Sequence, residues 1–384
     1  MDIITILKAA IKHGASDIFI TAGRPATLKV NGRMATFSEE CLSDQQAREL
    51  VLSTMTDAQK QVFERDKECN YAIDSKGVMR FRVSAYYQRN RIAMVLRLVK
   101  DTIPTIEELH IPAITKELAM IKRGFVILVG ATGCGKSTTL AAMIGYRNQN
   151  STGHILTIED PIEFDHKHGG CVITQREVGI DTESYEIALK NSLRQAPDVI
   201  MIGEIRSRDT MEYGVTFAET GHLCLSTLHA NNANQAMDRI INFFPEDRQR
   251  QLLLDLSLNL KAVVAQRLIP KKDGSGLAVA VEVMLNTPLI GSLIEKGRLS
   301  EIKDVMKRSR ELGMQTFDQA VYDLYAAGEI SYDDALKNAD SANEVRLMIK
   351  LGSQAAESPR NLSMQSLSVE AEDEDNTDGA SPNH

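Results

Sequence analysis

Every fixed position of the pattern G-x-x-x-x-G-K-[ST] is filled by the stretch Gly130-Ala-Thr-Gly-Cys-Gly-Lys-Ser-Thr138. The preceding residues, 125–129, are apolar and mostly β-branched, which is typical of a buried parallel strand. Residues 138–143 are predicted to form a helix. A strand, a glycine-rich turn and a helix in this order form a phosphate-binding loop, so the chain is predicted to bind a nucleoside triphosphate.

Each type of residue in this loop has a chemical role. The glycines let the backbone curl, so that its N–H groups point inward around phosphate oxygens. The following helix N-terminus adds about half a positive charge. Lys136 is predicted to reach the outer phosphates, and Ser137 to offer its hydroxyl to Mg²⁺. The predicted nucleotide-binding residues are Gly130, Ala131, Thr132, Gly133, Cys134, Gly135, Lys136, Ser137 and Thr138.

Length and composition are those of an ordinary globular protein. At about 150 residues per domain, 384 residues suggest two or three domains. The five cysteines are scattered without a C-x-x-C pair, so a disulfide framework and a zinc ribbon are not expected and a reducing cytoplasm fits best. No apolar run approaches the ~20 residues that cross a bilayer, and the first residues do not resemble a signal peptide. The sequence therefore predicts no transmembrane segment.

The net charge of −8 is concentrated at the end of the chain. The residues after Gly352 carry seven acidic residues and one arginine, which leaves the rest of the chain at about −2. The same residues are rich in Ser, Asp, Glu and Asn, so residues 352–384 are predicted to be a disordered acidic tail. A nearly neutral folded part offers no basic field for nucleic acid, which is therefore not expected as a partner.

Residues 1–100 are predicted to form a small α+β domain. Amphipathic periodicity indicates helices at residues 2–13, 43–52 and 57–63. Strand patterns occur at residues 16–20, 27–30, 33–37, 78–88 and 91–99. The pair Asn31-Gly32 is the strongest hairpin signal in the chain. Residues 101–112, which include Pro104 and Pro112, are the predicted linker to the next domain.

Residues 113–351 are predicted to form an α/β domain with a mainly parallel sheet, because strands and helices alternate along them. The strand candidates are residues 125–129, 154–158, 199–202 and 222–227. Past Pro288 the pattern is helical, over residues 288–294, 300–307, 316–326, 331–337 and 341–351. In such a domain the ligand binds at the carboxyl ends of the parallel strands.

Polar clusters follow three of these strands, at residues 156–164, 197–206 and 219–229. Acids at strand ends beside a phosphate loop can hold Mg²⁺ or activate the attacking water. Gly203, and not an aspartate, precedes Glu204, so the water-activating carboxylate can also come from the first cluster. His222 and His229 are an odd number of positions apart, so one strand cannot place both on the same face. One of them is expected past the strand end.

The four stretches GATGCGKST, TIEDPIEF, RQAPDVIMIGEIR and ETGHLCLSTLH resemble the conserved boxes of the hexameric ATPases of type IV pili and type II secretion. Within this family the chain is similar to the retraction branch, the PilT/PilU motors of twitching motility, and most of all to its PilU side. The resemblance covers about residues 1–351. It implies a PAS-like N-terminal domain, a RecA-like ATPase domain, and a six-membered ring that binds ATP between the two domains.

The resemblance also implies catalytic roles. Glu163 is implied as the general base, and Glu204 as a residue that holds Mg²⁺ or its water together with Ser137. His229 is implied as a sensor of the γ-phosphate, with His222 nearby. The expected cofactors are therefore ATP and Mg²⁺.

Two arginines of the N-terminal strands match positions from which the family directs positive charge to the nucleotide. They are Arg82 and Arg97. An arginine finger contributes about 10³–10⁵ in rate in nucleotide hydrolases. The four-cysteine zinc site and the longer N-terminus of the family's extension motors do not occur in this sequence.

Three departures from the retraction motor favour the PilU side of the branch. Where that motor reads A-I-R-N-L-I-R, this chain has Gly291 and Glu295 in place of the two arginines. Ser207 stands where an aspartate usually follows Glu-x-Arg, and the acidic tail is additional. These departures predict a protein that assists a second retraction ATPase.

The sequence therefore predicts a homo-hexameric ATPase that couples ATP hydrolysis to pilus retraction at the cytoplasmic face of the inner membrane. Its expected partners are a second retraction ATPase ring and the inner-membrane platform protein of the pilus. The alternative is a nucleotide-binding regulatory subunit that is not itself a motor. A nucleic-acid translocase is disfavoured by the nearly neutral folded part.

Overall fold

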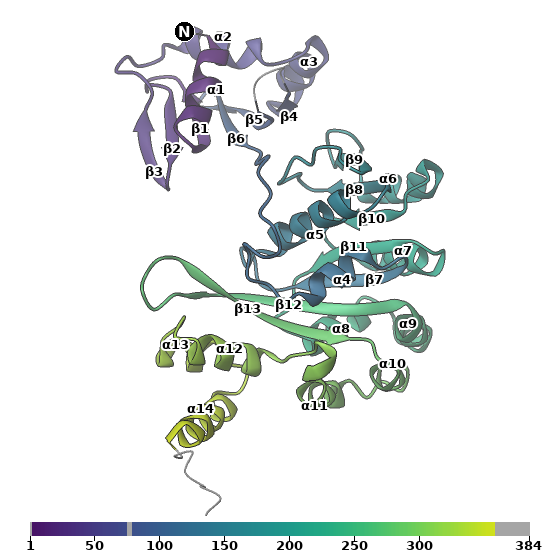
Figure 1. Cartoon of the computed structure of the whole chain (residues 1–384). Helices are drawn as coiled ribbons and strands as arrows, with labels where there is room; N and C mark the ends of the chain where they lie inside the picture. The colour runs from purple at the N-terminus through teal and green to yellow at the C-terminus, as the bar shows by residue number, and fades with distance from the viewer. Residues whose placement is uncertain (1, 75–78, 358–384) are drawn as a thin grey trace, which may run out of the picture.

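The computed structural model of the protein describes residues 2–74 and 79–357. Figure 1 shows an N-terminal sheet with its helices at one end of the molecule, a larger sheet in the middle and a group of helices at the other end. Residue 78, where a strand was expected to start, and residues 358–384 of the predicted tail lie outside the described residues.

The N-terminal part is an antiparallel six-stranded sheet with helices on one face, which confirms the α+β prediction. The strand order is β3-β2-β1-β6-β5-β4. Its elements are α1 (Ile3–Lys12), β1 (Ala15–Thr21), β2 (Thr27–Val30), β3 (Arg33–Thr36), α2 (Asp44–Ser53), α3 (Asp57–Asp66), β4 (Glu68–Ile73), β5 (Phe81–Gln88) and β6 (Arg91–Leu98).

Alternation along the strands separates the two faces of this sheet. Phe81 of β5 and Met94 of β6 are buried in one core with Leu50 of α2 and Phe63 of α3. The intervening positions point to the opposite face. Arg82 and Arg97 are among them and are direct partners in the register of β5 and β6.

The central sheet has the order β13-β12-β7-β11-β10-β8-β9, and only β13 runs antiparallel to its neighbour. The mainly parallel sheet is thus confirmed. Its elements are α4 (Ile114–Met120), β7 (Gly124–Val129), α5 (Lys136–Asn150), β8 (Gly153–Glu159), β9 (Cys171–Glu177), α6 (Tyr185–Ser192), β10 (Val199–Ile202), α7 (Arg208–Glu219), β11 (Leu223–Leu228), α8 (Ala233–Asn242), α9 (Glu246–Asn259), β12 (Leu260–Pro270) and β13 (Leu277–Leu285).

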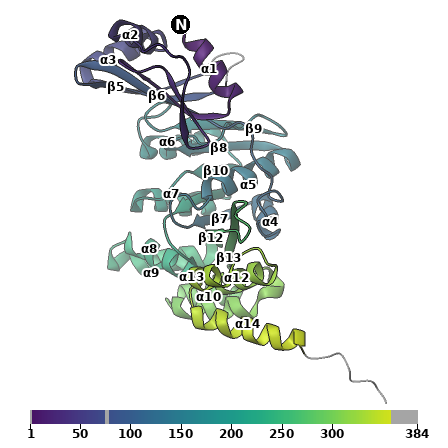
Figure 2. The ribbon, with the colours of Figure 1, turned by 90° about the vertical axis from the view of Figure 1, so that its left-hand side faces the viewer.

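Helices cover both faces of this sheet. Figure 2 shows α4 and α5 on one side and α6, α7, α8 and α9 on the other. Each side has its own core: Met143 of α5 packs with Val126 and Met201, while Phe217 of α7 packs with Phe125. Strands buried on both faces read as continuous apolar runs, which explains why β7 and β10 were evident in the sequence.

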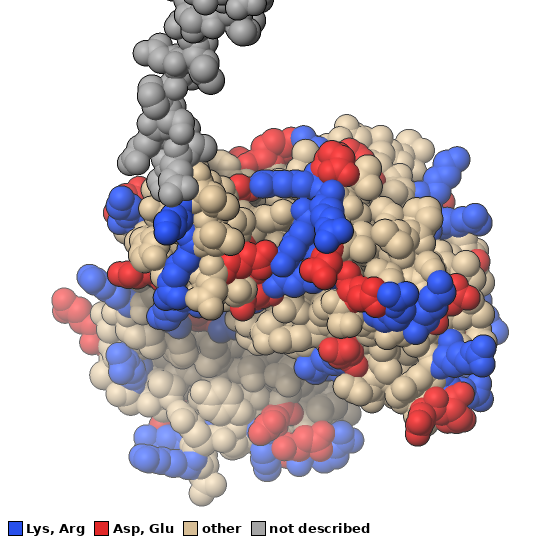
Figure 3. All heavy atoms as spheres, turned by 90° about the horizontal axis from the view of Figure 1, so that it is seen from below, with Lys and Arg blue, Asp and Glu red and all other residues tan. Residues whose placement is uncertain are grey.

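The C-terminal helices pack beside β12 and β13 (Figure 1). They are α10 (Pro288–Glu295), α11 (Ile302–Arg308), α12 (Phe317–Ala326), α13 (Tyr332–Asn338) and α14 (Ala342–Glu357). Acidic and basic side chains are interspersed on this end of the molecule, without a large field of one sign (Figure 3). Among the described helices, none combines the length and the apolar character needed to cross a membrane.

Several element boundaries differ from the sequence predictions. The strands β4, β9, β12 and β13 were not predicted. The strand β12 follows α9 without an intervening turn residue, so nothing in the sequence marks its start. The strand β11 begins at Leu223, which leaves His222 outside it, and α14 continues past residue 351 to Glu357.

Candidate functional site

The phosphate loop connects β7 to α5, as the sequence predicts. Gly130 has a φ of 152°, and a Cβ atom there would come within 2.3 Å of the Cys134 sulfur and 2.7 Å of the Gln266 carbonyl oxygen. Only glycine therefore fits at the entry to the loop. The ammonium group of Lys136 donates to the carbonyl oxygens of Gly130, at 2.8 Å, and Ala131, at 2.9 Å.

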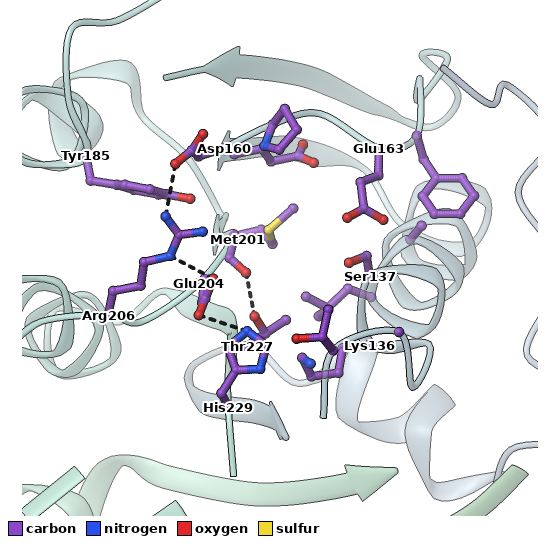
Figure 4. Close-up of a pocket in the computed structure, with 18 of the residues that line it drawn as sticks. Lys136, Ser137, Asp160, Glu163, Tyr185, Met201, Glu204, Arg206, Thr227 and His229 are labelled. Carbon is purple, nitrogen blue, oxygen red and sulfur yellow. Dashed lines mark hydrogen bonds and ion pairs between the residues drawn. The ribbon is translucent and has the colours of Figure 1, made fainter. Parts of the chain in front are cut away.

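The loop opens into a cavity of about 270 Å³ at the carboxyl ends of the parallel strands (Figure 4). The cavity is lined by Thr132, Gly133, Lys136, Ser137, Leu140, Ala141, Glu159, Asp160, Pro161, Glu163, Phe164, His166, Tyr185, Met201, Gly203, Glu204, Arg206, Thr227 and His229. Residues from all four boxes thus meet in one place. This position is where an open α/β sheet binds its ligand.

Glu163 and Ser137 lie on one side of this cavity (Figure 4). The Glu163 carboxylate forms no hydrogen bond or ion pair with another described residue. An uncommitted carboxylate beside a phosphate loop can accept a proton or hold a water, because its oxygens are not occupied by protein donors.

Glu204 lies on the other side, in a chain of charged groups (Figure 4). Its Oε1 is 3.1 Å from Nε2 of His229, and its Oε2 accepts a hydrogen bond of 2.8 Å from Nε of Arg206. Arg206 in turn donates to Asp160 at 3.2 Å. Glu204 and His229 were predicted site residues. The sequence did not predict roles for Arg206 and Asp160, although both belong to the polar clusters at residues 197–206 and 156–164.

The glycine before Glu204 has a steric cause. A Cβ atom at Gly203 would come within 2.9 Å of the Tyr185 hydroxyl and 3.2 Å of the Glu159 Cα. Any larger residue at this position, aspartate included, would therefore have to displace the Tyr185 side chain and press against the backbone of β8.

Glu159 is a site residue that sequence reasoning did not select. It is 8% exposed, accepts hydrogen bonds from Thr157 at 2.7 Å and Gln175 at 3.0 Å, and lines the cavity. Burial raises the pKa of Glu159 to about 7. A carboxyl group that titrates near neutral pH beside a phosphate site makes the charge of that site dependent on pH.

A neighbouring cavity of about 400 Å³ joins the N-terminal sheet to the phosphate loop. It is lined by Arg82 and Arg97 on one side, and by Thr138 and Glu163 on the other. Arg97 donates to Asp17 at 2.7 Å. Both predicted arginines therefore face the helix that follows the loop.

The two histidines lie at opposite ends of β11. His229 directly follows the strand at the cavity, whereas His222 precedes it and contacts the Phe217 carbonyl and the Thr220 hydroxyl at the end of α7. His222 is not among the residues that line the cavity.

The oxygen donors of the cavity fit Mg²⁺. Ser137 and Glu204, the predicted metal residues, both line it. No cluster of three or more His, Cys, Asp or Glu side chains arranged to hold a metal ion is found in the described part of the chain. The two oxygen donors of Ser137 and Glu204 suit Mg²⁺, which is commonly held by few protein oxygens together with substrate phosphates.

The fold and the cavity are those of a P-loop ATPase, and comparison with known proteins gives the family. The chain belongs to the family of the type II/IV secretion system protein, which matches residues 1–317. It is similar to the type IV pilus ATPase PilU of Pseudomonas aeruginosa, with 60% identity over 375 residues that make up 98% of each chain. It is 39% identical to the type IV pilus retraction ATPase PilT of the same species, over 88% of this chain and 98% of that one.

A solved structure of the pilus retraction motor PilT with bound ADP has the same fold, with a TM-score of 0.84 and 37% identity. The match covers 91% of this chain and 100% of that chain. The resemblance drawn from the four boxes is thereby confirmed: this is a PilU-type pilus ATPase related to the PilT motor. Membership of this family implies hydrolysis of ATP.

Proposed function

We propose that this protein is a homo-hexameric, Mg²⁺-dependent ATPase that drives type IV pilus retraction at the cytoplasmic face of the inner membrane, as an auxiliary to a second retraction ATPase. The observation that carries the catalytic part is the uncommitted carboxylate of Glu163 beside Ser137 in the phosphate-loop cavity. A subunit that only binds nucleotide needs the loop but has no need of a free base at that place.

Nucleotide binding starts at Lys136. Its ammonium group exchanges the carbonyl oxygens of Gly130 and Ala131 for phosphate oxygens, so the positive charge is already at the loop before the ligand arrives. Ser137 would contact Mg²⁺, and Glu204, whose oxygens are engaged by His229 and Arg206, would hold a water of the ion, which neutralises charge on the phosphates when it is bound.

Glu163 takes the proton from the attacking water. Its carboxylate is free to do so, whereas the oxygens of Glu204 are engaged by His229 and Arg206. His229 lies against Glu204 and next to the loop, so it can respond to the presence of the γ-phosphate. Arg82 and Arg97 supply positive charge from the N-terminal domain and thereby link hydrolysis to the approach of the two domains.

The auxiliary role is supported by helix α10. A Cβ atom at Gly291 would come within 3.1 Å of the Asn286 side-chain oxygen and 3.3 Å of the Ser257 carbonyl oxygen. The helix therefore packs closely against the end of α9 at a position where the retraction motor carries an arginine. Glu295, which is exposed, replaces a second arginine, and like charges brought together across an interface cost several kcal/mol. A ring with these changes is expected to engage the pilus platform with the help of a partner ring.

The catalytic part is tested with Glu163→Gln. Loss of a general base lowers kcat by at least ~10²-fold while ATP binding is retained. The Lys136→Ala variant is the control, because it is expected to lose both binding and turnover. If Glu163→Gln hydrolyses ATP at the wild-type rate, Glu204 becomes the next candidate for the base. If the wild-type protein binds ATP without hydrolysing it, the regulatory-subunit function is supported instead.

The auxiliary part is tested in cells. Deleting the partner motor is expected to stop retraction even though this protein is present, and a catalytically dead partner is expected to restore it. Single pili that retract at normal frequency and force without any partner motor would show that this protein works alone.

A further inference from the structure

A buried charge cluster joins the N-terminal sheet to the central sheet. Glu177, the last residue of β9, is 4% exposed. Two arginines of the N-terminal part approach it from the other side of the domain boundary. The Nη2 atom of Arg80 is 3.7 Å from Oε2 of Glu177, and the Nε atom of Arg82 is 3.5 Å from Oε1.

This cluster is incompletely bonded. Charge-assisted hydrogen bonds between arginine and carboxylate measure about 2.7–2.9 Å, and both contacts here are longer. Oε2 of Glu177 and Nε of Arg80 have no hydrogen-bond partner among the described residues. Burial raises the pKa of Glu177 and lowers the pKa of Arg82, and their mutual attraction opposes both shifts. Charges buried in this way contribute little net stability, so the cluster needs another explanation.

The orientation of Arg82 supplies that explanation. Its Nε atom is turned to Glu177, while its terminal nitrogens form no hydrogen bond with other described residues. The same side chain lines the cavity shared with Thr138 and Glu163, whereas Arg80 does not. Glu177 thus holds the inner edge of the guanidinium group and leaves its outer donors available to the cavity.

Glu177 also lies next to the turn that carries Glu163. The backbone amide of Ile162 favours the charged form of the Glu177 carboxylate. One buried carboxylate therefore contacts both the arginine from the N-terminal domain and the residue before the candidate base.

We infer that Glu177 is a positioning residue for ATP hydrolysis, which sets the orientation of Arg82 across the domain boundary relative to Glu163. This inference rests on the proposed role of Arg82 at the nucleotide. A competing explanation is that Glu177 merely holds the two domains together. The two explanations differ in what happens when Arg82 is absent.

The test is a double-mutant cycle on the full chain, with kcat, KM for MgATP and ADP affinity as readouts. Misplacing a catalytic group by about 1 Å can cost up to ~10²-fold, so Glu177→Gln is expected to lower kcat about 10-fold. The KM for MgATP and the ADP affinity should change by less than about 3-fold, because the phosphate loop is untouched. In the Arg82→Ala background the same substitution should cost less than about 2-fold, because its effect passes through Arg82.

Arg80→Ala is the matched control. It removes the other half of the same cluster but no residue of the cavity, so kcat should remain within about 2-fold of wild type. Thermal melting of every variant shows whether the domains still fold. Glu177→Asp, which keeps the charge but draws it back by one methylene, is expected to lose less activity than Glu177→Gln, and this ranking remains informative if the Gln variant is unstable.

Each outcome has one meaning. If Glu177→Gln and Arg82→Ala are additive, or if Arg80→Ala loses as much activity as Glu177→Gln, Glu177 acts on domain cohesion and the inference is wrong. If Arg82→Ala is impaired and Glu177→Gln is not, the inference fails while the proposed function stands. If Arg82→Ala hydrolyses ATP like wild type, the proposed role of Arg82 fails and the inference with it.

Discussion

Two charged clusters of the ATPase domain differ in how far their polar atoms are occupied. In the nucleotide cavity the Glu163 carboxylate forms no hydrogen bond or ion pair among the described residues, and the ammonium group of Lys136 is held by atoms of its own loop, the Gly130 and Ala131 carbonyl oxygens and the Cys134 sulfur. In the C-terminal cluster Asp318, with 1% of its side chain exposed, accepts hydrogen bonds from the backbone of Asp340 at 2.8 Å and Ser341 at 2.9 Å.

The remaining members of the C-terminal cluster are equally engaged. Lys303 contacts Asp318 at 3.1 Å, and Arg267 contacts Asp340 at 2.7 Å. Glu282 accepts hydrogen bonds from the first backbone amides of α8 and α12. Every side chain named in the C-terminal cluster is bonded to another described residue, whereas the nucleotide cavity combines engaged groups, such as Glu204 and His229, with the unbonded carboxylate of Glu163. The presence of one unbonded carboxylate, and not the number of charges, therefore distinguishes the nucleotide cavity from the structural cluster.

The largest expected effect concerns the structural cluster. Asp318→Ala removes the buried partner of two backbone amides and of Lys303, which keeps only its 3.4 Å contact to Asp340. This change should lower the free energy of unfolding by about 3–5 kcal/mol. Urea unfolding measures this loss. Below the unfolding transition the variant should still bind ATP, because the nucleotide cavity is intact.

Asp323→Ala is the matched control for that substitution. Asp323 pairs with Arg310, and both side chains are more than 40% exposed. An exposed pair contributes about 0–1 kcal/mol, so the control should unfold almost like wild type. If the two variants lose the same free energy of unfolding, the buried cluster contributes no more to stability than an exposed ion pair.

The sequence predicts best those strands whose residue pattern is distinctive. The strands β7 and β10 are apolar runs bounded by polar or glycine residues, and both were predicted within one residue of their ends. The strand β9 carries Thr174, Gln175 and Arg176, so its pattern does not resemble a buried strand. The strand β12 begins where α9 ends, and only its pairing with β7 and β13 shows that it is a strand.

The four boxes were sufficient to predict those residues of the candidate site that they contain. Each box contributes residues to the cavity, and the odd spacing of the histidines placed one of them past the end of β11. Glu159 and Glu177 were not selected, because a carboxylate matters at these positions only through burial and contacts to residues far away in the chain. Contacts between residues far apart in the chain decide which carboxylate is bonded within the protein and which is not.

A smaller effect is expected from Glu159, whose pKa burial raises to about 7. Below that pH the side chain is neutral, and above it a negative charge faces the phosphate site. Binding of an anion favours the neutral form, so the affinity for Mg²⁺-free ADP should fall about 3–10-fold more between pH 6 and 8 in wild type than in Glu159→Gln. Comparison of the two proteins cancels the titration of ADP itself. If the ADP affinities of wild type and Glu159→Gln change with pH in the same way, Glu159 does not titrate at the site.

The smallest effect is expected at His222, which directly precedes β11 and is a control for His229, which directly follows it. The Nδ1 atom of its ring contacts the Phe217 carbonyl oxygen at 3.2 Å and the Thr220 hydroxyl at 3.1 Å, so this nitrogen is bonded to the end of α7. His222→Ala should therefore leave kcat within about 2-fold of wild type and cost only about 1 kcal/mol in unfolding free energy. His229 stands at the opposite end of β11, 3.1 Å from Glu204, and His229→Ala should lower kcat about 10-fold or more because it lines the cavity beside the phosphate loop. ATPase assays and thermal melts of the two variants test this directly. A large loss of turnover in His222→Ala with an unchanged melting temperature would mean that a side chain at the amino end of β11, away from the nucleotide cavity, still controls hydrolysis. The carboxyl ends of the parallel strands would then not be the only place of catalytic control among the described residues.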